Sequence, residues 1–282
     1  VKIYFAISLL FWIFAWWFNT RLSRLPPTKL IKVVSPLLFG STIIFIWEAT
    51  IISFNVSPVI LPAPSTVFVR LINSVPILWV DFVQTVIKGA MSGFFIGCLS
   101  AFLVALLVDN YKFLERGLLP IGNFMAALPI VGTAPILVMW FGFDWQSKAA
   151  VVTVMVFFPM LINTIQGLQM SDKIQRDLMK TYNASPWQTL TKLRLATAMP
   201  FIFNGLKICS TLALIGAIVA EFFGSPIRGM GFRITTEVGR FALDMVWAEI
   251  TIAAITGSIL YGGIVLIERK ITFWHPSQRG RA

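Results

Sequence analysis

The chain has 282 residues, of which 57% are hydrophobic and only 12% are charged. Soluble domains carry about 25% charged residues, so this composition excludes an ordinary soluble fold and is typical of a protein embedded in a bilayer. The formal net charge is +11, and the basic residues lie between apolar runs, which favours membrane topology over nucleic-acid binding.

Seven apolar runs are long enough, or nearly so, for the roughly 20 residues that cross a bilayer as a helix. The predicted spans are 3–18, 34–54, 86–108, 119–140, 149–168, 199–222 and 245–267. The first run could be a signal peptide, but no small-residue cleavage site follows it and its flank is strongly basic, so we expect a retained span. The fourth run contains three prolines, which predicts a kinked or broken helix. They are Pro120, Pro129 and Pro135.

Lys and Arg are unevenly divided between alternate loops. The first set of loops holds most of the 23 basic residues, namely Arg21, Arg24, Lys29, Lys32, Lys112, Arg116, Lys173, Arg176, Lys180, Lys192, Arg194, Arg269, Lys270, Arg279 and Arg281. The opposite set holds Lys2, Arg70, Lys148, Arg228, Arg233 and Arg240. Because cytoplasmic loops retain Lys and Arg, we expect the N-terminus outside and the C-terminus in the cytoplasm.

Two outer segments differ from simple loops. Residues 55–85 begin with a proline-rich stretch and then become amphipathic, which predicts a helix lying along the outer face. Residues 223–243 are polar and rich in glycine, which is typical of a re-entrant or capping loop.

The inner loop between the fifth and sixth spans carries the strongest functional pattern. Ser171 or Asp172 can cap a first helix, and Asn183 tolerates the left-handed conformation that ends one. Ser185 can cap a second helix, with Pro186 at the favoured first position. On pattern alone, this helix–turn–helix is either a solvated connector or a docking element for another protein. The aromatic residues in it favour docking, because such side chains are typical of interfaces.

This loop resembles the Glu-Ala-Ala loop of permease subunits of binding-protein-dependent ABC importers. The family pattern is Glu-Ala-Ala, three residues, Gly, nine residues, Ile, one residue and Leu-Pro. The corresponding residues here are Asp177, Leu178, Met179, Asn183, Leu193, Leu195 and Ala196. The acid, the turn-former and the aliphatic residues are kept in type, whereas the small pair, the Gly and the Pro are replaced.

Three further stretches are similar to the nitrate, sulfonate, taurine and pyrimidine-precursor branch of that family. They are residues 60–65, 127–142 and 216–224. The resemblance implies an all-α polytopic membrane protein with the six-helix core of type I ABC importers plus one extra N-terminal transmembrane helix. The implied parts are 1–33, the extra helix and a basic cytoplasmic linker; 34–275, the permease domain with a coupling loop at 169–198; and 276–282, a cytoplasmic tail.

The resemblance also implies a function, as the permease subunit of an ATP-driven importer in the bacterial inner membrane. Two permease chains, identical or homologous, would form a pathway that opens alternately to either side. Two cytoplasmic ATPase subunits would bind ATP and Mg²⁺, and a periplasmic or lipid-anchored solute-binding protein would deliver a small organic solute. The phosphate-binding sequence Gly-x-x-x-x-Gly-Lys-Ser/Thr is not found in this chain, so we expect no cofactor on it. Membrane lipid is an expected partner and nucleic acid is not.

Two sets of site residues follow. The expected ATPase-docking residues are Asp177, Lys180, Tyr182, Asn183, Ala184, Ser185, Pro186, Trp187 and Gln188. The candidate pathway residues are Glu221, Phe222, Met139 and Pro135. Charged residues inside spans are costly, so Glu221 either lines the pathway or holds the end of its helix. The sequence does not indicate which solute is carried.

Other functions are less well supported by the sequence. A stand-alone secondary transporter or channel is the main alternative, although many secondary transporters contain inverted repeats and none stands out here. A membrane-embedded enzyme would need a cluster of catalytic side chains or metal ligands. The chain has two distant cysteines, Cys98 and Cys209, and a single histidine, His275, so we expect no catalytic residue and no metal ligand.

Overall fold

A computed structural model of the chain describes residues 2–24, 28–126 and 129–274, and these residues form helices with no strand among them. Five helical stretches are long and apolar enough to cross a membrane, which confirms the expected all-α polytopic fold. They are Leu30–Phe54, Val75–Asp109, Trp145–Gln169, Pro186–Phe222 and Leu243–Ile271. Each contains one predicted span. His275 lies outside the described residues.

The chain divides into two compact units. The first consists of Val1–Leu78 and Ile234–Thr251, and the second of Trp79–Arg233 and Ile252–Ala282. The division follows packing within the chain, and it differs from the functional ranges that the resemblance implies.

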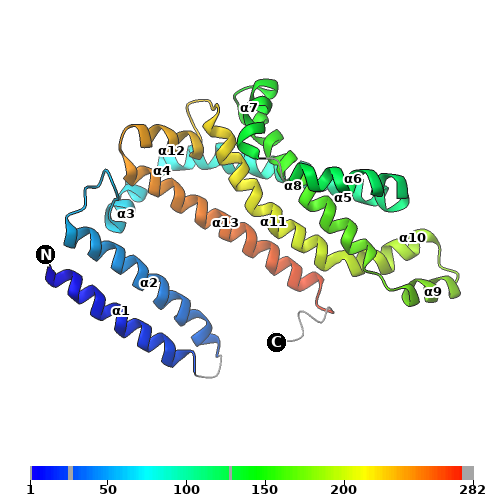
Figure 1. The fold of residues 1–282 in the computed structure, drawn as a ribbon, viewed down its shortest axis with the longest axis horizontal. Coiled ribbons are helices and arrows are strands. Elements are labelled where there is room, and N and C mark those ends of the chain that lie inside the picture. Colours follow the sequence, from blue (N-terminus) through cyan, green and yellow to red (C-terminus); the bar gives the residue numbers. More distant parts are fainter. Residues whose placement is uncertain (1, 25–27, 127–128, 275–282) are drawn as a thin grey trace. The chain divides into compact units, whose positions relative to one another are not determined.

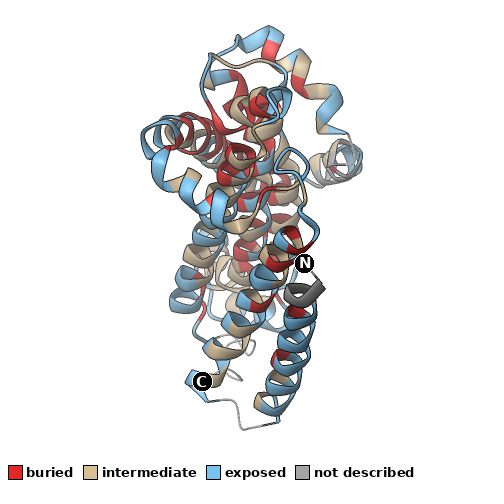
Figure 2. Cartoon of the chain, turned by 90° about the vertical axis from the view of Figure 1, so that its left-hand side faces the viewer, coloured by how far each residue is buried: buried red, intermediate tan, exposed pale blue. Residues whose placement is uncertain are grey.

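In the first unit, α1 (Lys2–Leu22) packs against α2 (Lys29–Phe54), and the Ser35 hydroxyl donates to Asn19 Oδ1 at 2.6 Å. Most described side chains of α1 are exposed, whereas those of α2 are exposed or half-buried with a few buried ones (Figure 2). The predicted first span lies in α1, which is not among the five long apolar stretches, so its membrane crossing stays a prediction.

The predicted outer segment 55–85 contains two helices rather than one. α3 (Pro64–Asn73) begins beside Glu48 of α2, whose carboxylate accepts from the Ser65 N–H at 2.9 Å. α4 (Val75–Phe82) continues through the π-helix η1 (Val83–Met91) into α5 (Ser92–Asn110). The single surface helix predicted over this segment is therefore wrong in its second half. Pro76 is the one proline in this second half, and it lies in the first turn of α4, where proline is tolerated. The chain therefore continues from α4 into the following helix without a break.

The run 119–140 is not one membrane-crossing helix. It is divided between α6 (Lys112–Ala126) and α7 (Ile130–Phe141), which confirms that the proline-rich run is broken. Pro129 is the N-cap of α7, with an extended ψ of 115°. Pro120 and Pro135 lie inside α6 and α7, so of the three prolines Pro129 alone stands at a helix start, where its missing N–H is tolerated.

The second unit is built around α8 (Trp145–Gln169), which packs against both α5 and α11 (Leu195–Phe222) (Figure 1). Small residues allow this close approach. A Cβ added at Gly93 of α5 would lie 2.5 Å from the Ala149 carbonyl oxygen of α8, and one at Gly167 of α8 would lie 2.8 Å from Phe201 Cβ of α11. Close backbone approach at glycines is typical of helix pairs in membranes.

The predicted glycine-rich loop at 223–243 contains a helix, α12 (Met230–Gly239), ahead of α13 (Leu243–Ile271). The irregular parts are the turn before α12, where Gly229 has φ of 120°, and residues 240–242 after it, where Phe241 has φ of 60°. In the second unit, Lys207 of α11 forms an ion pair with Glu268 of α13 at 3.0 Å.

Candidate functional site

The segment after α8 begins with a well-capped helix. α9 spans Lys173–Thr181, and the Asp172 side chain accepts a hydrogen bond from the Ile174 N–H at 3.2 Å. The Gln175 side chain accepts from the Asp172 N–H at 3.3 Å, which completes a capping box. The predicted cap at Asp172 is confirmed.

A tight turn at Asn183 ends this first helix. Asn183 has φ of 51°, and its N–H donates to the Lys180 carbonyl at 2.8 Å. The Ala184 N–H donates to the Met179 carbonyl at 2.9 Å, so carbonyls at the helix end are satisfied. The predicted left-handed residue is confirmed. The conformation also accounts for glycine at the same place in the family pattern, because glycine adopts positive φ without steric cost.

Substitutions at Asn183 are expected to differ in effect. Asn183→Gly should leave the turn intact, whereas Asn183→Val should destabilise it by about 1–2 kcal/mol, because a β-branched side chain is disfavoured at positive φ. The measurement is the rate of trypsin cleavage at Lys180 in the purified protein, which should rise for the Val variant alone. Equal cleavage rates in the two variants would contradict this role of the left-handed turn.

The second helix starts as the sequence predicts but does not end there. Ser185 Oγ accepts from the Gln188 N–H at 3.2 Å, and Pro186 occupies the first position of α10 (Pro186–Thr189). The π-helix η2 (Leu190–Arg194) then joins α10 to α11 without interruption. The second helix therefore runs into the predicted span 199–222 without a break, because no glycine or proline follows Pro186 until Pro200 inside α11. Where the chain enters the membrane stays a prediction.

We call α9, residues 182–185 and α10 the docking hairpin. Its large apolar side chains are exposed: Ile174 by 76%, Leu178 by 54%, Tyr182 by 77% and Trp187 by 70%. A cluster of this kind favours a binding surface over a solvated connector. All nine predicted docking residues lie on the hairpin, including Asp177 and Lys180, which form an exposed ion pair at 3.1 Å. Their contact with an ATPase stays a prediction.

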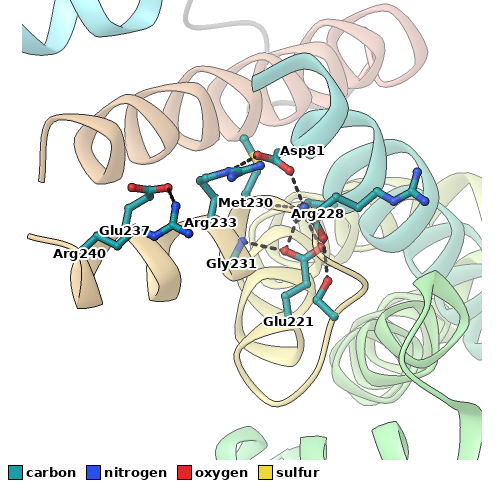
Figure 3. Close-up of polar contacts among 11 residues, drawn as sticks. Asp81, Glu221, Arg228, Met230, Gly231, Arg233, Glu237 and Arg240 are labelled. Atoms are coloured by element: carbon teal, nitrogen blue, oxygen red, sulfur yellow. Dashed lines mark hydrogen bonds and ion pairs between the residues drawn. The ribbon is translucent and has the colours of Figure 1, made fainter. Parts of the chain in front are cut away.

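At the opposite end of α11, buried polar groups join three elements. Glu221 is 2% exposed, and its carboxylate accepts from the Thr85 hydroxyl of η1 at 2.8 Å and from the Gly231 N–H of α12 at 2.7 Å (Figure 3). The Thr85 oxygen accepts from the Met230 N–H at 2.7 Å. In this structure Glu221 therefore holds the end of its helix.

Asp81 provides a second buried carboxylate beside Glu221. It is fully buried, and its carboxylate accepts from the Gly229 N–H at 2.6 Å and from Arg233 Nε at 2.8 Å (Figure 3). A Cβ at Gly229 would lie 2.5 Å from Glu221 Oε1, so a side chain does not fit there. We call this group the outer polar cluster, after the side of the membrane that the charge pattern predicts: Asp81, Thr85, Glu221, Gly229, Met230, Gly231 and Arg233.

Lys148 is part of the buried structure near this end rather than an exposed loop cation. It is 1% exposed, and its ammonium donates to the Phe143 carbonyl at 2.6 Å and to the Gly224 carbonyl. Nearby, the Gln84 amide donates to Asp144 Oδ1 at 2.9 Å, and this hydrogen bond lowers the pKa of the Asp144 carboxyl below its ordinary value.

The remaining predicted pathway residues are more accessible than Glu221. Phe222 is 44% exposed and Met139 is 81% exposed. Pro135 lies inside α7, one turn before Met139, and α7 packs against α11. Their role in a pathway stays a prediction.

Sequence reasoning gave no signal for a cavity of about 700 Å³ in the second unit. Its walls come mainly from α5, α11 and α13 and are almost wholly apolar, with Phe94, Phe102, Phe203 and Ile264 among them. Such residues are common throughout membrane helices, so the sequence does not indicate that these particular side chains line one cavity. Among the described residues, no group of three or more His, Cys, Asp or Glu side chains is placed to hold a metal ion.

Long apolar helices joined by a capped, exposed hairpin define an all-helical, multi-pass membrane protein. Residues 93–273 match the family of binding-protein-dependent transport system inner membrane components, and the chain belongs to this family. It is thus a permease component of an ABC importer and an inner-membrane protein.

Relatives of known description agree with the expected branch. The chain is 31% identical to a probable ABC transporter permease protein of Haemophilus influenzae, over 83% of this chain and 95% of the relative. It is 28% identical to a formylaminopyrimidine transport permease of Halalkalibacterium halodurans, over 88% and 98%. It is 30% identical to a putative aliphatic sulfonates transport permease of Bacillus subtilis, over 86% and 88%.

Proposed function

We propose that this chain and a second permease chain, identical or homologous, form an alternating-access pathway for a small organic solute. Two cytoplasmic ATPase subunits bind the docking hairpin and carry the ATP and Mg²⁺ chemistry, while a solute-binding protein delivers the solute from outside. The observation that carries the proposal is the exposed hairpin, which continues without a break into the long helix α11. A force applied at Trp187 therefore passes through η2 to a helix of the core.

The proposal fixes an orientation. Most Lys and Arg residues lie in loops on the side of the docking hairpin, so that side is cytoplasmic, with the N-terminus outside and the C-terminus inside. On this topology the outer polar cluster faces the solute-binding protein. Labelling of single introduced cysteines with a membrane-impermeant maleimide, at Ile227 and at Ile174, tests both ends.

An organic solute is supported by two observations. The named relatives transport a formylaminopyrimidine and, putatively, aliphatic sulfonates. The cavity between α5, α11 and α13 has apolar walls, which suit an organic group better than a small hydrated ion. Met139 and Phe222 are accessible enough to contact a solute, whereas Glu221 would contact one only after the outer polar cluster opens.

Removing Trp187 is expected to weaken ATPase binding. Trp187→Ala should cost about 2 kcal/mol, or roughly a 30-fold loss of affinity, because exposed tryptophans often dominate interface energies. The test is co-purification of the detergent-solubilised chain with the ATPase encoded beside it, followed by titration of the purified subunits. Trp140→Ala is the matched control, because Trp140 is 74% exposed but lies on α7, before the start of α8.

Two results would overturn the proposal. The first is equal ATPase affinity for Trp187→Ala, Trp140→Ala and the parent chain. The second is solute transport by the reconstituted chain without any ATPase, which would favour the stand-alone transporter.

A further inference from the structure

The helix that leads from the docking hairpin into the core contains a short segment that can bend. η2 (Leu190–Arg194) has π-helical hydrogen bonding, and its residues are half-buried or exposed. Short π segments are places where a helix bends. A push on the hairpin would therefore be absorbed by bending at η2, unless another contact stiffens it.

Arg194, the last residue of η2, supplies such a contact. Its Nη1 lies 2.6 Å from Asp109 Oδ2 and its Nη2 lies 2.5 Å from Asp109 Oδ1, which is the paired geometry of a guanidinium on a carboxylate. Nη2 also donates to the Leu168 carbonyl at 3.2 Å. The two side chains are largely buried, with 20% and 7% of their areas exposed.

These three residues come from the cytoplasmic ends of three core helices. Asp109 lies in the last turn of α5, and Leu168 lies in the last turn of α8, where carbonyls have no partner within the helix. Arg194 directly precedes α11. One side chain thus ties the ends of α5 and α8 to the point where the docking hairpin meets α11.

We infer that Arg194 and Asp109 are positioning residues that transmit movement of the docking hairpin to the core of the second unit. The inference rests on the proposed function, because it assumes that an ATPase moves the hairpin. The pair holds η2 straight, so α5, α8 and α11 move with the hairpin as one body. The same helices reach the outer polar cluster through Thr85, in η1 before α5, and through Glu221, at the end of α11.

The test measures a conformational change beside the outer polar cluster while the ATPase acts on the docking hairpin. Cys98 and Cys209 are buried, so a fluorescent maleimide reports on a cysteine placed at Ile227, which is 85% exposed. The complex with its co-purified ATPase is trapped with Mg-ATP and orthovanadate, and the change in fluorescence is recorded. ATP hydrolysis is measured separately, without vanadate. Asp109→Asn should keep ATPase binding and hydrolysis but reduce the fluorescence response roughly three- to tenfold.

Other substitutions separate positioning from general stability. Glu268→Gln is the matched control, because Lys207 and Glu268 form another largely buried ion pair of the same unit that does not touch the hairpin. It should respond like the parent, and Asp109→Glu, which keeps the carboxylate, should restore most of the response. If Asp109→Asn does not assemble, Arg194→Lys gives the same comparison, because lysine keeps the charge but cannot form the paired bonds.

The outcomes distinguish the two proposals. A parent chain that binds no ATPase overturns the proposed function itself. A parent complex that hydrolyses ATP without a response at position 227 overturns the inference alone. The same holds if Asp109→Asn or Arg194→Lys responds like the parent, or if Glu268→Gln loses the response equally.

Discussion

Asp81→Ala is expected to lower the free energy of unfolding by about 3 kcal/mol or more, because it removes a buried carboxylate from its charged and backbone partners. The Gly229 N–H loses its acceptor, and Arg233 loses the carboxylate at 2.8 Å. The turn before α12 should then detach from α4. The measurement is an SDS titration of the detergent-solubilised protein, followed by tryptophan fluorescence.

Asp177→Ala provides the comparison for this prediction. It removes the same side chain from an ion pair whose two side chains are 51% and 78% exposed, so the expected change is no more than about 1 kcal/mol. If both variants unfold at the same SDS fraction as the parent, the outer polar cluster contributes nothing to stability and its assignment is wrong.

Gly93→Ala is expected to cost about 3 kcal/mol, near the upper end of what overpacking a tight core costs. The new Cβ would lie 2.5 Å from the Ala149 carbonyl oxygen and 2.5 Å from Val152 Cβ, so the backbones of α5 and α8 must separate. The Thr153 hydroxyl, which donates to the Gly93 carbonyl at 3.3 Å, would lose its partner as the helices part. Thermal unfolding in detergent should show a clearly lower midpoint.

The control for this prediction is Gly117→Ala. Nothing lies within 4 Å of a Cβ added at Gly117, which sits in an exposed turn of α6. Alanine is a better helix former than glycine by about 1 kcal/mol, so this variant should be unchanged or slightly more stable. Similar losses of stability in both variants would argue against close packing of α5 on α8.

Local sequence signals predicted much of the architecture. Long apolar runs located the five long helical stretches, and Asp172, Asn183 and Ser185 marked the ends of the two hairpin helices because capping depends on residues three or four apart. The same local logic failed where a break or its absence depended on packing. It predicted one surface helix over 55–85, where α4 continues into η1 and α5, and it did not specify which of the three prolines in 119–140 marks the break.

The outer polar cluster could not have been assembled from the sequence. Asp81 and Arg233 are 152 positions apart, and Thr85 and Glu221 are 136 apart. A charge count alone assigned Lys148 to a solvated outer loop, although the structure buries it against the carbonyls of Phe143 and Gly224. Such partners are set by how helices pack, and a one-dimensional pattern carries no signal for them.

The unbroken helix from Pro186 to Phe222 has a geometric consequence. Its 37 residues extend about 55 Å at 1.5 Å per residue, whereas the hydrocarbon core of a bilayer is only about 30 Å thick. On the proposed topology, the surplus length extends the Trp187 end of the helix beyond the hydrocarbon core on the cytoplasmic side, where the proposed ATPase binds. Because no flexible loop lies between Trp187 and α11, the helix itself sets the direction in which the Trp187 side chain points. Each residue added to α11 would rotate that direction by about 100° around the helix axis.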